Sequence, residues 1–395
     1  MAGASLHESF KHASSCSWNP LSTRILSLTP PRAEIIRNCF CKALSATRTK
    51  DPFLLNVQHT KNPFLSSTQV EGRTRRVPLF HTCATSSQAT TLSDPVVPIA
   101  PQARTPPFHV LITGSTKGIG YALARKFLQE GDKVIICSRS GENVDKAVEN
   151  LTQEFGEQRA YGIPADVRNG ESVQKLISFA KEKLGYIDVW INNAGSNAYT
   201  YKPLVETNDE MIMEIVETNT IGVMICCREA IKMMMSQDRG GHIFNMDGAG
   251  ADGRPTPRFA AYGATKRSLL QLTKSLQAEL KMQRIKSVVI HMLSPGMVTT
   301  DLLMSGSDTP QAKFFINVLA EPADMVAEFL VPRVRALLEN GMTKPTYIRF
   351  LTGFKAYSQI LSRLLFNARK NRYLQEEEQQ SGASSSTTLL KRAST

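Results

Sequence analysis

The sequence predicts an α/β fold, a single doubly wound parallel sheet of about seven strands over residues 108–351. Short apolar runs alternate there with longer amphipathic stretches, a pattern typical of parallel strands joined by helices. Glycines mark the passage from the first apolar run to the first amphipathic stretch. Because ligands bind at the carboxyl ends of the strands in such sheets, we expect the functional residues directly after the apolar runs.

Each element follows from its own pattern of apolar residues. The expected strands are residues 108–113, 133–138, 159–164, 187–192, 242–246, 286–293 and 345–351. The expected helices are residues 118–130, 142–155, 170–184, 207–219, 222–237, 259–283 and 321–339.

The first strand runs into a glycine-rich turn that opens a helix. Gly114 permits the tight turn, Gly118 lets the backbone approach a pyrophosphate, and Gly120 lets the helix pack closely on the strand. The anion would lie at the positive end of the helix. A glycine turn in another kind of α/β unit is the alternative. The residues expected to bind a dinucleotide here, in a Rossmann-type domain, are Thr113, Gly114, Ser115, Thr116, Lys117, Gly118, Ile119 and Gly120.

The second strand ends in Ser138 and Arg139 rather than in the acidic residue that would bind a ribose 2′-hydroxyl. Arg139 and Lys117 suit a 2′-phosphate, so we expect NADPH, with NADH still possible; ordinary surface charges are the alternative. Asp166 and Val167 follow the third strand and are expected at the adenine edge, although Asp166 could instead cap the next helix.

The fourth strand ends in Asn192-Asn193-Ala194-Gly195. Small residues and amides at a strand end let a flat cofactor lie against the backbone, so Asn193, Ala194 and Gly195 are further expected cofactor residues. An asparagine-rich turn without a ligand is the alternative.

Tyr262 and Lys266 lie four residues apart in an expected helix, which places both side chains on one face. A phenol with its free pKa of about 10 is a poor acid–base catalyst at neutral pH. A nearby ammonium favours the phenolate and brings the pKa of the tyrosine toward the useful range. We therefore expect this pair to be catalytic.

The segments on either side of residues 108–351 have a different composition. Residues 1–93 hold eleven Lys and Arg against four acidic residues and are rich in Ser and Thr, as in a plastid transit peptide; an uncleaved disordered tail is the alternative. Residues 94–107 are proline-rich and are expected as a linker. Residues 352–374 are expected as a basic amphipathic helix, and residues 375–395 as a disordered tail.

The distribution of charge and the spacing of the cysteines limit the kinds of partner and compartment that we expect. The net charge of +12 comes from surpluses of seven in residues 1–93 and five in residues 349–395, so residues 94–348 carry no net charge and we expect no nucleic-acid partner. The seven cysteines show no metal-ligand spacing, which favours thiols in a reducing compartment over zinc or disulfides.

Taken together, these motifs resemble the short-chain dehydrogenase/reductases, over roughly residues 108–351. The resemblance rests on the glycine turn, Asn-Asn-Ala-Gly, Asn219 in Asn-Thr-Ile-Gly, Tyr262-x-x-x-Lys266, and Pro-Gly-Met-Val-Thr-Thr from residue 295. It implies that Tyr262 gives a proton to a carbonyl, that Lys266 holds the nicotinamide ribose and lowers the tyrosine pKa, and that Asn219 supports a water in the proton relay. The residues it places against the nicotinamide are Pro295, Gly296, Val298 and Thr300.

The sequence departs from this family at the end of the fifth strand, where a serine usually binds the substrate oxygen. Residues 245–250 read Asn-Met-Asp-Gly-Ala-Gly and carry no hydroxyl. Either Ser196 or a backbone N–H near Gly248 substitutes, or the site is weakened by roughly 3 kcal/mol of barrier.

That departure, behind a plastid-like leader, is similar to the chlorophyll(ide) b reductases of the non-yellow-colouring group. The resemblance implies reduction of the 7-formyl group of chlorophyll b or chlorophyllide b to a hydroxymethyl group during antenna degradation. The alternatives are another plastid short-chain carbonyl reductase, such as one for ketoacyl thioesters, and a non-catalytic NADP-binding scaffold on membrane complexes.

The resemblance also suggests where the protein acts. We expect a peripheral protein on the stromal side of the thylakoid membrane, held by the helix at residues 352–374, or a helix that instead packs on its own domain or on a partner subunit. Expected partners are a membrane-anchored homologous reductase, light-harvesting complexes and other subunits in a homo- or hetero-oligomer. Core packing explains most of the methionines, with Met246, Met297 and Met304 as candidates for lining an adaptable pocket. Segments 248–258 and 301–316 are candidate lids.

Overall fold

The computed structural model describes residues 103–306 and 308–376. The expected transit peptide, most of the linker and nearly all of the C-terminal tail lie outside these residues. Within the described part, Arg104 belongs to the expected linker, yet its side chain is buried and pairs with Asp188 at 3.0 Å. The end of that segment therefore packs on the domain.

Seven parallel strands form one sheet in the order β3-β2-β1-β4-β5-β6-β7, which confirms the predicted fold class. The strands are β1 (His109–Thr113), β2 (Lys133–Ser138), β3 (Ala160–Pro164), β4 (Val189–Asn192), β5 (Gly241–Met246), β6 (Val288–Ser294) and β7 (Tyr347–Arg349). The order reverses between β1 and β4, so a crevice opens at the carboxyl ends of these two strands, where such sheets bind ligands.

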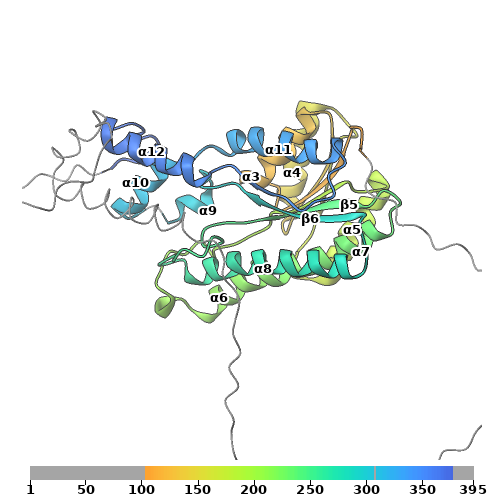
Figure 1. Ribbon diagram of the computed structural model, residues 1–395, viewed down its shortest axis with the longest axis horizontal. Coiled ribbons are helices and arrows are strands. Elements are labelled where there is room, and N and C mark those ends of the chain that lie inside the picture. Colours follow the sequence, from red (N-terminus) through yellow and green to blue (C-terminus); the bar gives the residue numbers. More distant parts are fainter. Residues whose placement is uncertain (1–102, 307, 377–395) are drawn as a thin grey trace, which may run out of the picture. The chain divides into compact units, whose positions relative to one another are not determined.

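Helices cover both faces of this sheet. In the described residues they are α3 (Gly118–Gln129), α4 (Gly141–Phe155), α5 (Gly170–Leu184), η1 (Leu204–Glu206), α6 (Asp209–Val216), η2 (Glu217–Ile221), α7 (Gly222–Met235), α8 (Ala260–Met282), α9 (Asp301–Met304), α10 (Pro310–Leu319), α11 (Ala323–Glu339) and α12 (Gly353–Phe366). Figure 1 shows α3, α4 and α11 on one side of the strands and α5, α7 and α8 on the other.

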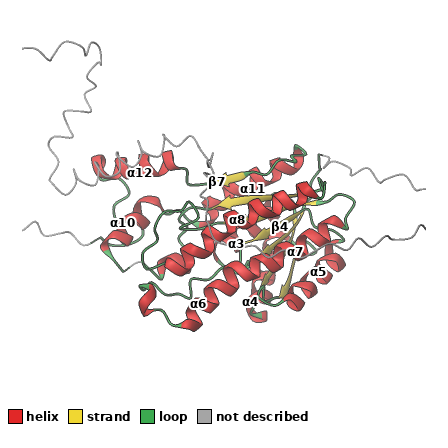
Figure 2. Cartoon of the chain, turned by 60° about the horizontal axis from the view of Figure 1, so that its bottom comes forward, coloured by secondary structure: helices red, strands yellow, loops and turns green. Residues whose placement is uncertain are grey.

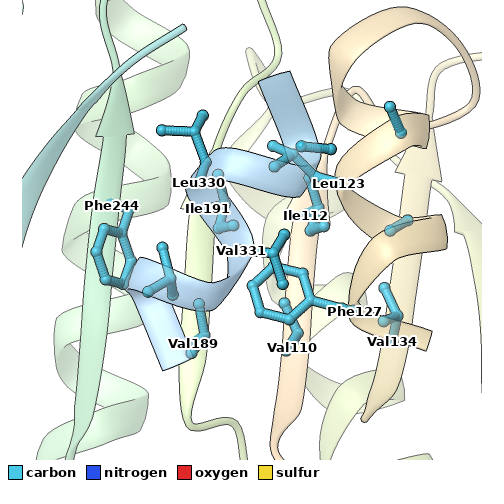
Figure 3. Packing of buried hydrophobic residues seen from close by; sticks show 14 of the residues in the cluster. Val110, Ile112, Leu123, Phe127, Val134, Val189, Ile191, Phe244, Leu330 and Val331 are labelled. Atoms are coloured by element: carbon cyan, nitrogen blue, oxygen red, sulfur yellow. The ribbon is translucent and has the colours of Figure 1, made fainter. Parts of the chain in front are cut away.

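Alternation along the strands supplies a core on each face. Val110 and Ile112 of β1 face the core under α3 and α11, whereas Leu111 between them faces the core under α5, α7 and α8. On the first face, Phe127 of α3 and Val331 of α11 meet above β1 and β4 (Figure 3). This packing holds the ends of β1 and β4 rigidly beside the crevice.

The structure refines two of the predicted helices. Residues 207–219 and 222–237, expected as separate helices, form one continuous run in which a π-helical turn at Glu217–Ile221 joins α6 to α7. Such turns occur often at functional sites. Segment 301–316, expected as a lid, contains the short helix α9 and the first residues of α10.

The described cysteines are small buried groups, as predicted. Cys137, Cys226 and Cys227 are free and buried, and burial raises the pKa of Cys137 and of Cys227 to about 12. Within residues 103–306 and 308–376, no helix combines the length and the apolar character needed to cross a bilayer.

Candidate active site

The glycine turn after β1 is shaped as a dinucleotide cradle. Gly114 and Gly118 have φ of +62° and +59°, which glycine adopts readily. A Cβ on Gly114 would lie 2.7 Å from the Cα of Ala194, and one on Gly120 would lie 2.5 Å from the carbonyl oxygen of Gly114. The helix α3 begins without a side-chain cap at Lys117 and without an acidic residue in its first turn. Its N-terminal amides therefore fit a pyrophosphate.

Hydrogen bonds join this turn to the end of β4. The hydroxyl of Thr113 accepts the N–H groups of Asn193 and Ala194 at 3.1 and 3.0 Å. The side-chain amide of Asn193 donates to the carbonyls of Thr113 and Gly114, both at 2.9 Å. Thr113 and Asn193 are thus committed to holding the two strand ends together, and their contribution to a cofactor site is to shape its backbone.

Two other expected cofactor residues have side chains inside the domain. The Ser115 hydroxyl donates to the Ile112 carbonyl at 2.5 Å and accepts the Cys137 N–H at 3.1 Å. The Val167 side chain is buried, and a Cβ on Gly222 would lie 2.8 Å from it. Any cofactor contact by Ser115 or Val167 would therefore use the backbone.

Tyr262 and Lys266 lie one turn apart near the start of α8, beside the end of β5. The Nζ of Lys266 is 5.6 Å from the centre of the Tyr262 ring and donates to the Met246 carbonyl at 3.3 Å. A Cβ on Gly248 would lie 2.4 Å from the Tyr262 hydroxyl. The phenol is therefore held directly against the backbone that follows β5.

Asn219 completes this group from the π-helical turn. Its Oδ1 accepts the Ser196 N–H, and its Nδ2 donates to the Ser196 carbonyl, both at 2.8 Å. Nδ2 also reaches the hydroxyl of Thr265 at 3.1 Å. A Cβ on Gly195 would lie 3.3 Å from Oδ1 of Asn219 and 3.6 Å from Nζ of Lys266. The structure thus brings together the Asn, Tyr and Lys that the sequence predicts.

Burial sets the protonation of the catalytic pair. Burial and the nearby Asp247 carboxylate raise the pKa of Tyr262 well above its usual value. Burial also lowers the pKa of Lys266 to about 8. Burial disfavours the phenolate and so opposes the lowering of the tyrosine pKa that is predicted for Lys266, which stays a prediction. Tyr262 is consequently a protonated phenol at neutral pH, the state that can donate a proton to a carbonyl.

Comparison with known proteins identifies the family to which this arrangement of residues belongs. The short chain dehydrogenase family model matches residues 108–311. The chain belongs to the short-chain dehydrogenase family.

Individual relatives agree with this family. The chain is 68% identical, over 274 residues, to "Chlorophyll(ide) b reductase NOL, chloroplastic" of Oryza sativa subsp. japonica, covering 69% of this chain and 80% of that protein. It is 67% identical over 272 residues to the protein of the same description from Arabidopsis thaliana, covering 69% and 78%. Among solved structures, an alcohol dehydrogenase from the archaeon Thermococcus sibiricus complexed with 5-hydroxy-NADP superposes with a TM-score of 0.52 and 26% identity, covering 62% of this chain and 95% of that one.

The segment that short-chain dehydrogenases place against the nicotinamide passes over the glycine turn. Gly296 has φ of +73°, and a Cβ there would lie 2.7 Å from the Leu351 Cβ. A Cβ on Gly118 would lie 3.2 Å from the Thr300 methyl group. Thr300 therefore lies beside the cradle, and nicotinamide contacts by Pro295, Gly296, Val298 and Thr300 stay predictions.

The two positions expected for the family's usual serine, Asp247 and Gly248, hold a buried carboxyl and a glycine. Gly248 lies against the Tyr262 hydroxyl, and Asp247 precedes it. The Tyr347 hydroxyl of β7 donates to Asp247. Burial raises the pKa of Asp247 to about 6, although Tyr347, Ser294 and Lys266 oppose this shift. Tyr347 was not identified from the sequence, because nothing local to β7 indicates that it reaches across β6.

Ser196, one of the two suggested substitutes for the missing serine, is already engaged. Its hydroxyl donates to Glu214 at 2.9 Å and accepts the Ala198 N–H at 2.9 Å. The hydroxyl therefore stabilises its own turn, and the prediction that it could replace the missing serine lacks support from this geometry.

The cations expected around the adenosine ribose have acidic neighbours. Lys117 pairs with Asp301 at 2.9 Å, and Arg139 approaches Glu214 at 4.0 Å. Both lysine and aspartate of the first pair are largely exposed, so this bridge is weak and open to exchange with a phosphate.

Asp166 does not cap the next helix. Asn169 caps α5 by accepting the Ser172 N–H at 3.0 Å. Asp166 instead pairs with Arg168 at 2.7 Å, which lowers the pKa of the aspartate. The capping alternative is therefore wrong, and the adenine role of Asp166 stays a prediction.

A small cavity of about 10 Å³, with room for roughly one water molecule, lies beside Tyr262. Its lining includes Thr200, Phe259 and Tyr262. Phe259 packs on Tyr201 with ring centres 4.8 Å apart and meets the edge of Tyr262 at 5.9 Å. Gly306 follows α9, and a Cβ there would lie 3.2 Å from both Phe259 and Tyr201. Gly306 thus lies against this aromatic group, and a lid role for residues 301–316 stays a prediction.

Met246 does not line this cavity, because its side chain is 3% exposed in the core under α3 and α11. Core packing is therefore the better description of Met246. Pocket-lining roles for Met297 and Met304 stay predictions.

The C-terminal helix α12 is amphipathic, but the arginines within it and after it form ion pairs and do not make a basic face. Arg369 and Arg372, which follow α12, each pair with Glu321 at 2.7 Å, and Arg363 pairs with Glu376. Figure 2 shows α12 beside α10 at one end of the domain, and the two helices are in contact. The exposed side chains of α12 include three large apolar ones, Phe354, Leu361 and Phe366, which are exposed by 87%, 47% and 71%.

Proposed function

We propose that this chain reduces the 7-formyl group of chlorophyll b or chlorophyllide b to a hydroxymethyl group, with NADPH as the reductant. The observation that carries the proposal is the 68% identity, over 274 residues, to the rice protein named as a chlorophyll(ide) b reductase. Residues 108–311, which match the family model, hold Tyr262, Lys266 and Asn219. The missing serine at Asp247 or Gly248 further separates this chain from a general carbonyl reductase.

Different residues of this chain perform different steps of the proposed reaction. A bound nicotinamide would supply hydride to the formyl carbon. The Tyr262 phenol donates its proton to the carbonyl oxygen as that oxygen takes up the electron pair. Lys266 and Asn219, which meet beside Gly195, return a proton toward the tyrosine and hold the ribose. The cavity beside Tyr262 has room for about one water molecule, so a macrocycle enters after residues 301–306 move away from the aromatic group of Tyr201 and Phe259.

The proposed activity is tested with the full chain, NADPH and chlorophyllide b, followed by chromatographic separation of the pigments. We expect 7-hydroxymethyl chlorophyllide a to accumulate in proportion to the NADPH oxidised. If NADPH is bound and neither chlorophyllide b nor chlorophyll b is reduced, the proposal is wrong, and a scaffold or a reductase for another carbonyl would take its place.

The preference for NADPH rests on Arg139 and Lys117. The second strand ends without an acidic residue, and the similar alcohol dehydrogenase was solved with an NADP derivative. A charge-assisted hydrogen bond to the 2′-phosphate is worth about 1.5–3 kcal/mol, so Arg139→Ala should lower kcat/KM for NADPH about tenfold to a hundredfold. The value for NADH should hardly change.

Lys133→Ala, at the opposite end of β2, is the matched control and should alter neither value. An equal loss with both cofactors, or a wild-type protein that prefers NADH, would contradict a 2′-phosphate site at Arg139.

We propose peripheral attachment to the stromal face of the thylakoid membrane through the exposed apolar face of α12. Phe354 and Leu361 are seven residues apart and share one face of the helix, and burying two such side chains gains about 1.5–3 kcal/mol each. The double variant Phe354→Ser/Leu361→Ser should reduce co-sedimentation with phosphatidylglycerol-containing vesicles at least about tenfold.

Met282 is 83% exposed at the end of α8, so Met282→Ser serves as a matched control that should leave co-sedimentation unchanged. Undiminished co-sedimentation of the α12 double variant would refute this route of attachment. Association with a membrane-anchored homologous reductase, with light-harvesting complexes or with further subunits forms part of the same proposal. Pull-down from solubilised thylakoids tests it, and recovery of the chain alone would count against it.

A further inference from the structure

One hydroxyl group near the catalytic tyrosine is buried and, in the part of the chain that the structure describes, has no hydrogen-bond partner. The Oγ1 atom of Thr200 is shielded from solvent and has no hydrogen-bond partner among residues 103–306 and 308–376. A buried hydroxyl without a partner costs free energy, and most buried side-chain polar atoms in native proteins have one. This atom is therefore a candidate contact for a ligand that the resting site does not hold.

The backbone that delivers Thr200 is itself strained. Ala198 and Tyr199, the two preceding residues, have φ of +52° and +48°, which non-glycine residues seldom adopt. The hydroxyl of Ser196 accepts the Ala198 N–H, and the side chain of Asn197 accepts the Tyr199 N–H, both at 2.9 Å. Strain that is held in place in this way is concentrated at functional sites.

The cavity that Thr200 lines also contains Tyr262. Two other uncharged polar residues of its lining are already engaged. Asn197 donates to the Leu302 carbonyl at 3.1 Å, and the Thr207 hydroxyl donates to the Pro203 carbonyl at 3.1 Å. Gly248, at the position of the usual serine, provides no side chain. Thr200 therefore supplies the unengaged threonine hydroxyl of this lining.

We propose that the Thr200 hydroxyl donates a hydrogen bond to the substrate oxygen that Tyr262 protonates, in place of the missing serine. This inference rests on the proposed carbonyl reduction. As the carbonyl π electrons move onto oxygen, Thr200 stabilises the growing negative charge and keeps its own proton, while the proton that is transferred comes from Tyr262. Binding of the carbonyl also satisfies the hydroxyl that is unmatched in the resting site.

The test compares Thr200→Val, which keeps the shape of the side chain but removes the hydroxyl, with Thr200→Ser, which keeps the hydroxyl. Loss of one donor to a developing oxyanion lowers kcat about a hundredfold or more, so Thr200→Val should show this loss with little change in KM. Thr200→Ser should retain most of the activity. Because the valine removes an unmatched polar atom, Thr200→Val should also melt at the same or a higher temperature than the wild type.

Thr152→Val in α4 is the control, since this threonine lies outside the lining of the cavity; it should keep its kcat. A Thr200→Val protein that melts at lower temperature and keeps its kcat would show a merely structural threonine and overturn the inference. A rise in KM at constant kcat would overturn it as well. If the wild type reduces another aldehyde but neither pigment, the proposed substrate is wrong, and the same comparison is made with that aldehyde.

Discussion

Replacement of Tyr262 by phenylalanine is expected to lower kcat for chlorophyllide b about a thousandfold, since general-acid catalysis contributes about 10²–10⁴. The phenol lies against Gly248 and beside Lys266, and both its burial and Asp247 keep it protonated. Phenylalanine keeps the ring that packs on Phe259 and removes only the proton donor. NADPH affinity, measured by fluorescence titration, should therefore be retained.

Tyr161→Phe provides the matched control. That hydroxyl donates to the Gln158 carbonyl near β3, on the far side of the sheet order from β5, and its loss should leave kcat unchanged. If Tyr262→Phe turned over pigment at the wild-type rate, Tyr262 would not be the proton donor. The scaffold alternative would gain support only if the wild type bound NADPH without reducing pigment.

Replacement of Lys266 by methionine is expected to lower kcat by about 10²–10³, because the proton relay then loses its ammonium. Burial lowers the pKa of Lys266 to about 8, below its usual value near 10.5, so the wild-type lysine is charged below pH 8 and neutral above it. Wild-type kcat should accordingly fall as the pH rises through about 8. This limb of the pH profile should be absent from Lys266→Met.

The same shift predicts the stability of the variant. A buried lysine with a lowered pKa costs folding free energy below that pKa, and the cost disappears as the pH rises from about 8 toward the unfolded value. Lys266→Met should therefore melt higher than the wild type at pH 7, with a smaller difference at pH 10, as measured by calorimetry. Lys274→Met, at an exposed position of α8, should change neither activity nor this pH dependence. A wild-type profile that stays flat through pH 9 would contradict the role given to Lys266.

Much of this architecture could be predicted because it depends on patterns of residues that lie close together in the sequence. The apolar run before Gly114 and the spacing of the glycines depend on residues close together in the chain, and the sheet order then places Asn193 beside them. The four-residue spacing of Tyr262 and Lys266 likewise needs only a helix. For these residues the structure confirms both the element and the neighbours.

Other features depend on contacts between distant segments and could not be predicted. Glu321 lies 48 residues from Arg369 in the chain yet neutralises it, so a segment that is basic in sequence is not basic on the surface. Asp247 bonds to Tyr347, which lies 100 residues away. The direction of the Tyr262 pKa depends on burial, which a sequence pattern does not give. A prediction of the role of Thr200 would have required the strained turn at Ala198 and Tyr199 to be recognised, although this turn contains no glycine.

In the proposed reaction, hydride reaches the 7-formyl carbon while Tyr262 provides the proton. It is tested most directly by incubating the full chain with chlorophyllide b and NADPH that is dideuterated at C4 of the nicotinamide, with mass spectrometry of the pigment product. We expect a hydroxymethyl product that carries one deuterium on its former formyl carbon in the wild type, and almost no product in Tyr262→Phe. Unchanged pigment in both proteins, or a product without deuterium on that carbon, would contradict it.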